Sequence, residues 1–522
     1  MTIGKINIKE SLASVERLLR EDKSVSPQVR AMMELLVVVI NLLLVKLGLN
    51  SKNSSVPPSK DPKRKRGSTK KEKGVKRKSG GQNGHKGSTL MKVDNPDHIE
   101  TLTVDRRTIP KGQYTYVGFD TRQVIEINIT SEVTEYRAEI LQDEHGNQFV
   151  AEFPAGVTRP VQYGASIKSQ AVYMSMQQLI PLDRIRDYFA DQCRIPISAG
   201  SIVNFNKSAF ELLEGAETII KKQLIAQEIL HVDETGINVN GELHWLHSAG
   251  NDLWTLFMAH EKRGNDAMKA MGVLENFRGI LCHDHWKPYF QFACVHALCN
   301  AHHLRELEWA WEQDGQAWAK KMQNLLLEIK EAVDVGGGIL TENAAKSARS
   351  RYRNILTKAE RECPLPEPKT DKSKRGRIPR SKSRNLLERL REFETETLRF
   401  MTEKIVPFTN NLGENDIRMT KVQQKISGCF RSFDGAQIFC RVRSYLSTCR
   451  KHSVAPTEAL KGLFSGSLPD FFQSSNKTPM ASVKFLRGSG GTLFTKFPQI
   501  MLSSYYFITG EKQIFAAVRK NC

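Results

Sequence analysis

Glu228-Ile-Leu-His-Val-Asp233-Glu-Thr-Gly236 is an apolar run that ends in acidic residues. Such a run is typical of a buried strand, here one that presents Asp233 at its exit. Two more strand-like runs, 241–249 and 253–260, follow, and Gly250-Asn251-Asp252 between them favours a hairpin turn. The region is therefore predicted to begin with three consecutive strands.

A helical stretch and a fourth strand follow these runs. Residues 265–277 have helical spacing, and Gly279-Ile-Leu-Cys-His-Asp284 is a second apolar run that ends in an acid. If the first and fourth strands are parallel neighbours, Asp233 and Asp284 meet at one sheet edge although 51 residues separate them. Two carboxylates there suit Mg²⁺ or Mn²⁺, because these cations prefer oxygen ligands. A third acid would complete a site for phosphoryl transfer on nucleic acid, whereas either aspartate alone more often only ends a strand.

The best candidate for the third acid is Glu414, in Pro407-Phe-Thr-Asn-Asn-Leu-Gly-Glu-Asn-Asp-Ile-Arg-Met419. Asn410 or Asn411 can cap a helix at this point. Helical spacing would place Glu414 on one face with three basic residues, and a DNA backbone could lie along that face. The three basic residues are Arg418, Lys421 and Lys425. The alternative is an ordinary surface ion pair of Glu414 with Arg418, worth about 0.2 to 0.5 kcal/mol.

The positive charge of the chain is concentrated in one segment. Over 522 residues, 77 Lys and Arg face 57 Asp and Glu, and this net charge of +20 favours a polyanionic partner. Residues 51–90 contain 13 Lys and Arg against Asp61 and Glu72, a net +11. Because such a composition buries little apolar area, it predicts a flexible basic arm that contacts nucleic-acid phosphates; a solvated linker or a nuclear import signal is the alternative. The DNA contacts are assigned to Lys63, Arg64, Lys65, Arg66, Lys76, Arg77 and Lys78.

The N-terminal region is predicted to contain two helices broken near Ser26-Pro27. The second contains the most apolar stretch, 35–45, which is about half of the ~20 residues that span a bilayer, so we expect a buried or self-associating helix. The chain start lacks the pattern of a signal peptide. Nine cysteines without a C-x-x-C pair do not indicate a secreted disulfide framework. These features predict a cytoplasmic protein outside the membrane.

Two segments lie between the arm and the acidic strands. Residues 96–163 alternate apolar and polar side chains in three short runs, 114–119, 124–129 and 148–153, and predict a small β-rich domain. Residues 164–227 return to helical spacing. A helix-turn-helix and a plain helical pair both fit the helical segment.

Cysteine and histidine residues gather after Asp284, which makes zinc the alternative to a hard cation. Cys294-x₄-Cys299 and His296-x₅-His302 are near the spacings of structural zinc sites. These residues fall on an apolar strand and the helix after it, where Cys and packed His are common in cores. We therefore do not expect zinc.

Several stretches of the chain resemble transposases of the insertion sequence 66 family. The core stretches are His-Val-Asp233-Glu-Thr-Gly, His283-Asp-His-Trp-Lys-Pro-Tyr, Leu298-Cys-Asn-Ala-His-His-Leu-Arg-Glu-Leu and Lys421-Val-Gln-Gln-Lys-Ile-Ser-Gly-Cys-Phe-Arg-Ser. Upstream, Leu47-Gly-Leu-Asn-Ser-Lys-Asn-Ser-Ser-Val-Pro-Pro-Ser and Arg77-Lys-Ser-Gly-Gly-Gln-Asn-Gly-His-Lys-Gly resemble the same family. The resemblance runs from about residue 35 to residue 467.

The resemblance implies an Asp-Asp-Glu site on an α/β, ribonuclease-H-like fold with a mixed sheet and a helical insertion. Asp233, Asp284 and Glu414 would bind the metal ions, Mg²⁺ or Mn²⁺. The activity would be cleavage at transposon ends, followed by attack of the freed 3′-OH on target DNA. The partners would be terminal inverted repeats, target DNA, a second copy of the chain and accessory proteins of the same element, in a bacterial or archaeal cytoplasm.

Three features depart from the family's pattern. Residues 88–162 contain no Cys, although the family usually has a cysteine-based zinc site there. Gly413-Glu414-Asn415 stands where Ala-Glu-Arg is more frequent, and residues 474–522 show no resemblance. The alternatives to a transposase are therefore a non-catalytic DNA-binding protein, such as a decayed transposase, and a metal-dependent nuclease that cuts without joining.

Composition, spacing and resemblance together divide the chain into eight segments. In order they are N-terminal helices (1–50), the basic arm (51–95), the small β-rich domain (96–163), a helical segment (164–227), the first part of the catalytic core (228–300), a helical insertion (301–405), the second part of the core (406–467) and an atypical tail (468–522).

Overall fold

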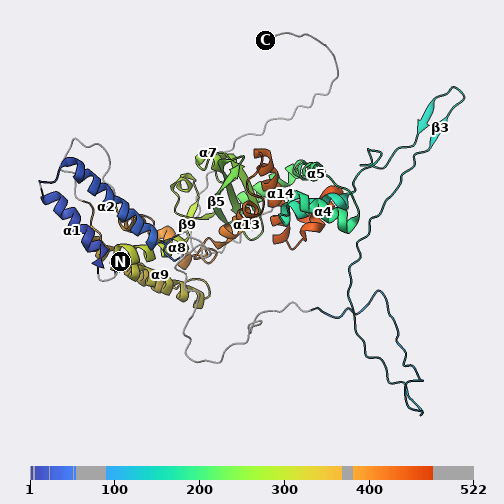
Figure 1. Ribbon diagram of the computed structural model, residues 1–522, viewed down its shortest axis with the longest axis horizontal. Helices are drawn as coiled ribbons and strands as arrows, with labels where there is room; N and C mark the ends of the chain where they lie inside the picture. The colour runs from blue at the N-terminus through green and yellow to red at the C-terminus, as the bar shows by residue number, and fades with distance from the viewer. Residues whose placement is uncertain are drawn as a thin grey trace, which may run out of the picture. The chain divides into compact units, whose positions relative to one another are not determined.

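A mixed five-stranded sheet is the framework of the protein (Figure 1). Its strand order is β7-β6-β5-β8-β9; the β5, β6 and β7 neighbours are antiparallel, and the β5, β8 and β9 neighbours are parallel. The strands are β5 Ile229–Val239, β6 Glu242–Gly250, β7 Thr255–His260, β8 Ile280–His283 and β9 Val295–Leu298. This computed structural model describes residues 2–3, 6–22, 24–50, 52–54, 90–366 and 380–473.

The first four of these strands follow the predicted order β-β-β-α-β, with α7 (Asn265–Ala270) as the helix. Strand β5 is longer than predicted, because β6 pairs with it from His231↔Gly250 to Val239↔Glu242. Asp233 therefore lies inside β5, and the prediction that it stands at the strand exit is wrong. The helix α7 is also shorter than the predicted 265–277.

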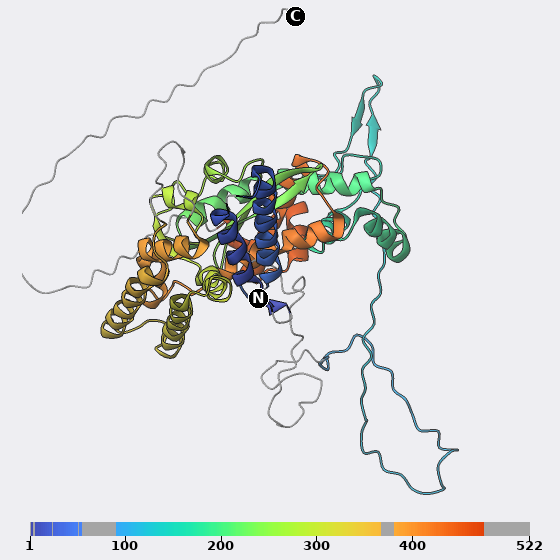
Figure 2. The same ribbon diagram turned by 60° about the vertical axis from the view of Figure 1, so that its left-hand side comes forward.

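Helices cover both faces of the sheet, as alternate residues of β8 show. Leu281 packs in an apolar cluster with the helices before β5, whereas Ile280 and Cys282 pack with the helices after β9. The first group is α3 Ala165–Val172, η1 Tyr173–Gln177, α4 Leu182–Cys193, α5 Ala199–Leu212 and α6 Glu214–Ile225. The second group is α8 Asn300–Asp314, α9 Ala317–Val335, α10 Glu342–Glu362, α11 Lys382–Glu392 and α12 Glu394–Leu398, which stand together in Figure 2.

The chain returns to the sheet after this helical insertion. Helix α14 lies along β7, where the Ser444 and Thr448 hydroxyls accept backbone N–H groups of the strand at 2.7 and 3.1 Å. These contacts satisfy an edge that would otherwise be unpaired. The returning elements are α13 Asn411–Ser427, α14 Phe433–Lys451, α15 Pro456–Phe464 and α16 Asp470–Gln473, and the short helices η2 Lys287–Gln291 and η3 Arg399–Met401 lie before them.

The N-terminal region forms two helices as predicted, α1 (Ile8–Glu21) and α2 (Pro27–Gly48), after the short strands β1 (Thr2–Ile3) and β2 (Ile6–Asn7). Of the two alternatives for the second helix, burial is contradicted, because only 6% of its apolar window is buried, and self-association stays a prediction. By length and composition alone, α2 is the one helix in the described part of the chain that could cross a membrane, which is weak support for a span. Its exposed large apolar side chains are Val29, Met32, Met33, Leu35, Leu36, Val38, Val39, Leu42 and Leu43.

Residues 96–163 contain fewer strands than their alternating pattern predicts. The segment forms the exposed hairpin β3 (Ile140–Gln142) and β4 (Gln148–Val150), and the runs 114–119 and 124–129 lie outside any strand. An alternating pattern describes side chains that suit a half-buried strand, but a strand also requires a ladder partner. The small β-rich domain at 96–163 thus stays a prediction.

The chain divides into two units, Met1–Asn476 and Lys477–Cys522, and the second lies outside the described residues. The predicted DNA-contact residues of the basic arm also lie outside them. The predicted tail from residue 468 is described only as far as residue 473.

Candidate active site

The register of two parallel strands brings the predicted aspartates to one place. In the pairing of β5 with β8, Ile229 lies opposite Ile280 and His231 opposite Cys282. Continued two residues beyond the printed pairs, the same offset aligns Asp233 with Asp284, which directly follows β8. A backbone N–H of Trp286 donates to Asp284 Oδ1 at 2.9 Å and fixes that carboxylate.

The carboxylate of Asp233 is strongly affected by its surroundings. Its pKa is raised from 3.8 to about 7, first by burial and then by the negative charge of Glu234; the charges of Asp284 and Glu414 raise it further. The backbone N–H of Glu234, which donates to Asp233 Oδ1 at 2.9 Å, partly opposes this shift. Two acids that are far from Asp233 in sequence therefore contribute to its raised pKa.

Asn410 fastens the helix of Glu414 to β5. It occupies the predicted cap position of α13, but its side chain makes no cap hydrogen bond to that helix. Instead, its Nδ2 donates to the carbonyl of Val232 at 2.8 Å, and its Oδ1 lies 2.7 Å from His231 Nδ1. Since Oδ1 can only accept, His231 donates from Nδ1. These bonds hold the start of α13 beside Asp233. Asn410 is four residues before Glu414 in the sequence.

Glu234 is a site residue that sequence reasoning missed. Its side chain is 2% exposed, and it accepts hydrogen bonds from Arg263 Nε at 3.0 Å and the Tyr289 hydroxyl at 2.5 Å. Burial raises its pKa, and the bonds from Tyr289 and Arg263 oppose that rise. The Arg263 guanidinium lies over the rings of Trp245 and Trp286, 4.9 and 4.2 Å from their centroids. The only available signal was a second acid directly after Asp233.

Sulfur and nitrogen ligands lie beside Glu414. Ligand atoms of Cys299, His302 and Glu414 are all within 4.8 Å of one another. The zinc alternative paired Cys294 with Cys299 and His296 with His302 by spacing; in the structure, Cys294 Sγ instead lies 4.0 Å from His296 Nε2. Helix packing thus forms a ligand group that the spacing did not indicate.

The predicted basic stripe on α13 is exposed. Arg418, Lys421 and Lys425 all face solvent. Lys421 Nζ donates to the carbonyl of Gly236 at 2.8 Å, and partial burial lowers its pKa. Among the described ion pairs, none joins Glu414 to Arg418, so the alternative surface pair does not form.

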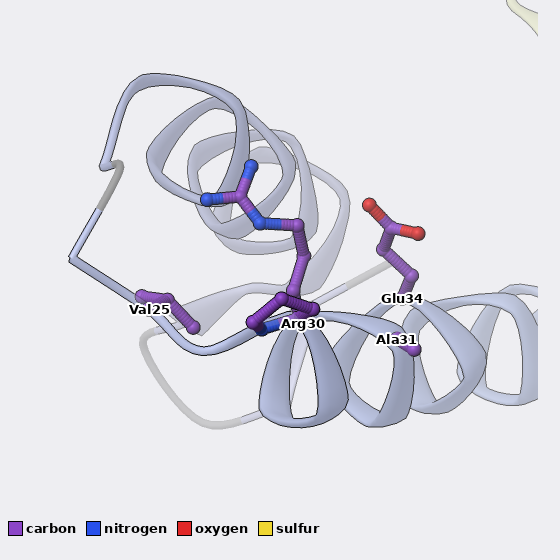
Figure 3. A pocket seen from close by; sticks show the side chains of 5 residues that line it. Val25, Arg30, Ala31 and Glu34 are labelled. Atoms are coloured by element: carbon purple, nitrogen blue, oxygen red, sulfur yellow. The ribbon is translucent and has the colours of Figure 1, made fainter.

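A surface hollow of the protein lies away from these acids. It is lined by Val25, Pro27, Arg30, Ala31 and Glu34 at the start of α2 (Figure 3). Arg30 donates to the backbone carbonyl of Asp22 at 2.6 Å and so braces the turn between α1 and α2. The hollow has one carboxylate, Glu34, beside the cationic Arg30, and so does not repeat the cluster of acids.

The raised pKa of Asp233 predicts a dependence of stability on pH. The carboxyl group of Asp233 binds a proton more tightly in the folded chain than in the unfolded chain. Protonation of Asp233 therefore stabilises the fold; this contribution is fully present below about pH 4 and is lost as pH rises through about 7. Asp233→Asn should therefore increase the free energy of unfolding by about 2 to 4 kcal/mol at pH 8 and by clearly less at pH 5. Urea denaturation at both pH values, with exposed Asp187→Asn as control, checks this. An equal gain at both pH values would contradict it.

Two protein-family models match the chain, one over the region of the three acids and one over the N-terminal region. Residues 160–438 match the family model described as Transposase IS66 family, which is 279 of the 522 residues. Residues 3–91 match a model described as Family of unknown function (DUF6444). No curated protein matches the chain. The first match contains Asp233, Asp284 and Glu414.

Proposed function

Because this chain belongs to the IS66 family of transposases, we propose that it cleaves DNA at transposon ends and joins the freed 3′-OH ends to target DNA. Asp233, Asp284 and Glu414 are the proposed catalytic residues. The observation that carries this proposal is the parallel pairing of β5 with β8, next to which Asn410 bonds the start of α13 to Val232. The charges of Asp284 and Glu414, which contribute to the raised pKa of Asp233, support it. Carboxylates that repel one another in this way favour a divalent cation between them.

The donor set fits Mg²⁺ or Mn²⁺. All three proposed ligands are carboxylates, and hard cations prefer oxygen. When bound, such ions stabilise the entering and leaving oxygens of a phosphodiester displacement. The chain itself holds the ligands: Trp286 N–H orients Asp284, and Asn410 anchors the helix of Glu414 to β5.

The ribonuclease-H-like fold is part of the proposal. Supporting it are three antiparallel strands extended by two parallel strands, with a helical insertion between β9 and α13. In this proposal the sheet supplies Asp233 and Asp284, and the helix after the insertion supplies Glu414.

DNA and a second copy of the chain are the proposed partners, together with accessory proteins of the same element. Joining two transposon ends requires two coordinated active sites. The exposed apolar side chains of α2 support self-association of the N-terminal helices. The exposed Arg418, Lys421 and Lys425 support DNA contact beside Glu414. A bacterial or archaeal cytoplasmic location also stays a prediction.

A strand-joining assay distinguishes the candidate functions. Labelled DNA from the ends of the encoding element is incubated with target DNA, the purified chain and Mg²⁺. We expect joined products. Nicked ends without joined products would indicate a nuclease, and binding without either product would indicate a decayed transposase.

The predicted arm gives a separate test of DNA binding. Replacing Lys63, Arg64, Lys65, Arg66, Lys76, Arg77 and Lys78 with Gln should weaken binding to all DNA sequences alike, because phosphate contacts carry no sequence information. Removing up to seven contacts should also reduce the slope of log affinity against log salt by as much as about 6. Fluorescence anisotropy at several salt concentrations measures both effects. An unchanged slope would show that the arm is only a linker.

A further inference from the structure

The ligand group beside the carboxylates differs from them in chemistry. Cys299, His302 and Glu414 offer one sulfur, one nitrogen and one oxygen atom, all within 4.8 Å of one another. Cys299 occupies the N-cap position of α8 and His302 lies in the first turn of that helix, while Glu414 lies in the first turn of α13. Sulfur and nitrogen ligands favour zinc-class ions over Mg²⁺, because Mg²⁺ prefers oxygen.

The spacing of these atoms fits one small ion. Cys299 Sγ lies 3.9 Å from Glu414 Oε1. A sulfur and an oxygen bound to the same tetrahedral zinc ion are about 3.5 Å apart, given bonds of about 2.3 and 2.0 Å. A small approach of the two side chains would therefore suffice. His302 Nδ1 is buried and has no hydrogen-bond partner among the described residues, so this nitrogen is available to a ligand.

Burial and the charge of Glu414 raise the pKa of the Cys299 thiol, but two other features of its surroundings favour a metal-bound sulfur. Its Sγ accepts the backbone N–H of Asn410 at 3.1 Å. It also stands at the N-terminus of α8, where the helix dipole favours negative charge. Hydrogen bonds from outer groups orient and tune metal ligands. The same asparagine therefore anchors the helix of Glu414 and contacts the candidate sulfur ligand.

We propose that Cys299, His302 and Glu414 form a second metal site, which binds a zinc-class divalent cation and withdraws Glu414 from the Mg²⁺ site. The binding itself is independent of catalysis, whereas the withdrawal rests on the proposed function. Since one carboxylate cannot fully serve both sites, bound zinc inhibits strand joining by competing for Glu414.

Cobalt(II) tests the binding, because a thiolate bound to Co²⁺ gives an intense near-ultraviolet charge-transfer band. We expect the full chain to show this band and Zn²⁺ to displace it. Cys299→Ser should abolish the band, and His302→Ala should weaken Co²⁺ binding at least ~10-fold. The control Cys429→Ser, which alters an exposed cysteine, should still show the band. A Co²⁺ complex without the band, or a band that survives in Cys299→Ser, would overturn the site.

Folding is checked by circular dichroism. If Cys299→Ser does not fold, His302→Ala decides the matter: unchanged Co²⁺ affinity in this variant would also overturn the site.

Strand-joining assays at fixed Mg²⁺ with rising Zn²⁺ test the withdrawal of Glu414. Zinc should inhibit the wild type, added Mg²⁺ should reverse the inhibition, and Cys299→Ser should require at least ~10-fold more zinc. Equal inhibition of both proteins would contradict competition at Glu414. A wild type that joins no DNA but shows the cobalt band would contradict the proposed function and leave the metal site intact.

Discussion

Asp284→Asn, Asp233→Asn and Glu414→Gln should each lower the rate of strand joining on the order of 10³-fold and leave DNA binding within about twofold. Loss of an outer-shell partner of a metal ligand costs 10- to 100-fold, so loss of a ligand should cost more. The substituted amides keep the shape of the side chain and remove its charge. DNA binding should persist, because the predicted phosphate contacts lie in the basic arm and on the exposed face of α13.

Two measurements make this prediction specific. Mn²⁺ binding, followed by calorimetry, should weaken in all three variants, and Glu242→Gln, an exposed acid at the start of β6, should change neither metal binding nor joining. The proposal would fail if Glu414→Gln joined DNA as fast as the wild type. The metal site would then consist of the two aspartates and a third ligand other than Glu414.

Arg263→Met should destabilise the fold by about 2 to 4 kcal/mol. Removing one partner of a buried ion pair costs roughly 3 to 5 kcal/mol, because the other charge stays buried without compensation. The Glu234 side chain is 2% exposed, but that of Arg263 is 38% exposed, so solvent screening reduces the expected cost. Chemical denaturation of the two proteins at pH 8 measures the difference.

The effect of Arg263→Met should depend on pH. Burial already raises the pKa of Glu234, and loss of the guanidinium raises it further, so a lower pH protonates Glu234 and removes part of the penalty. The difference from wild type should shrink between pH 8 and pH 5. Adding Glu234→Gln should recover stability at pH 8, whereas Arg186→Met, which breaks the exposed pair with Asp183, should cost at most ~1 kcal/mol. A large loss that neither pH nor Glu234→Gln alters would show that Arg263 acts through packing on Trp245 and Trp286.

Sequence patterns predicted an element of secondary structure well where the residues of that one segment were sufficient to indicate it. The apolar runs ending at Asp233 and Asp284 predicted strands in the right order, and Ser26-Pro27 marked the break between two helices. Strand length was less predictable: β5 continues to Val239 because of its pairing with β6. The runs within 96–163 show the same limit, since an alternating pattern does not supply a ladder partner.

The sequence by itself determined the order of the first four core strands along the chain, the two helices before the arm, the concentration of positive charge at 51–90 and the family resemblance. Each of these depends on residues that are near one another in the chain or on motifs in a fixed order. Only the tertiary structure decided that Glu234 is buried against Arg263 and Tyr289, that Asn410 binds β5 rather than its own helix, and that Cys299 and His302 lie beside Glu414. The physical reason is that burial and ligand contact depend on which distant segments pack together. Spacing along a chain does not encode the distance between such segments.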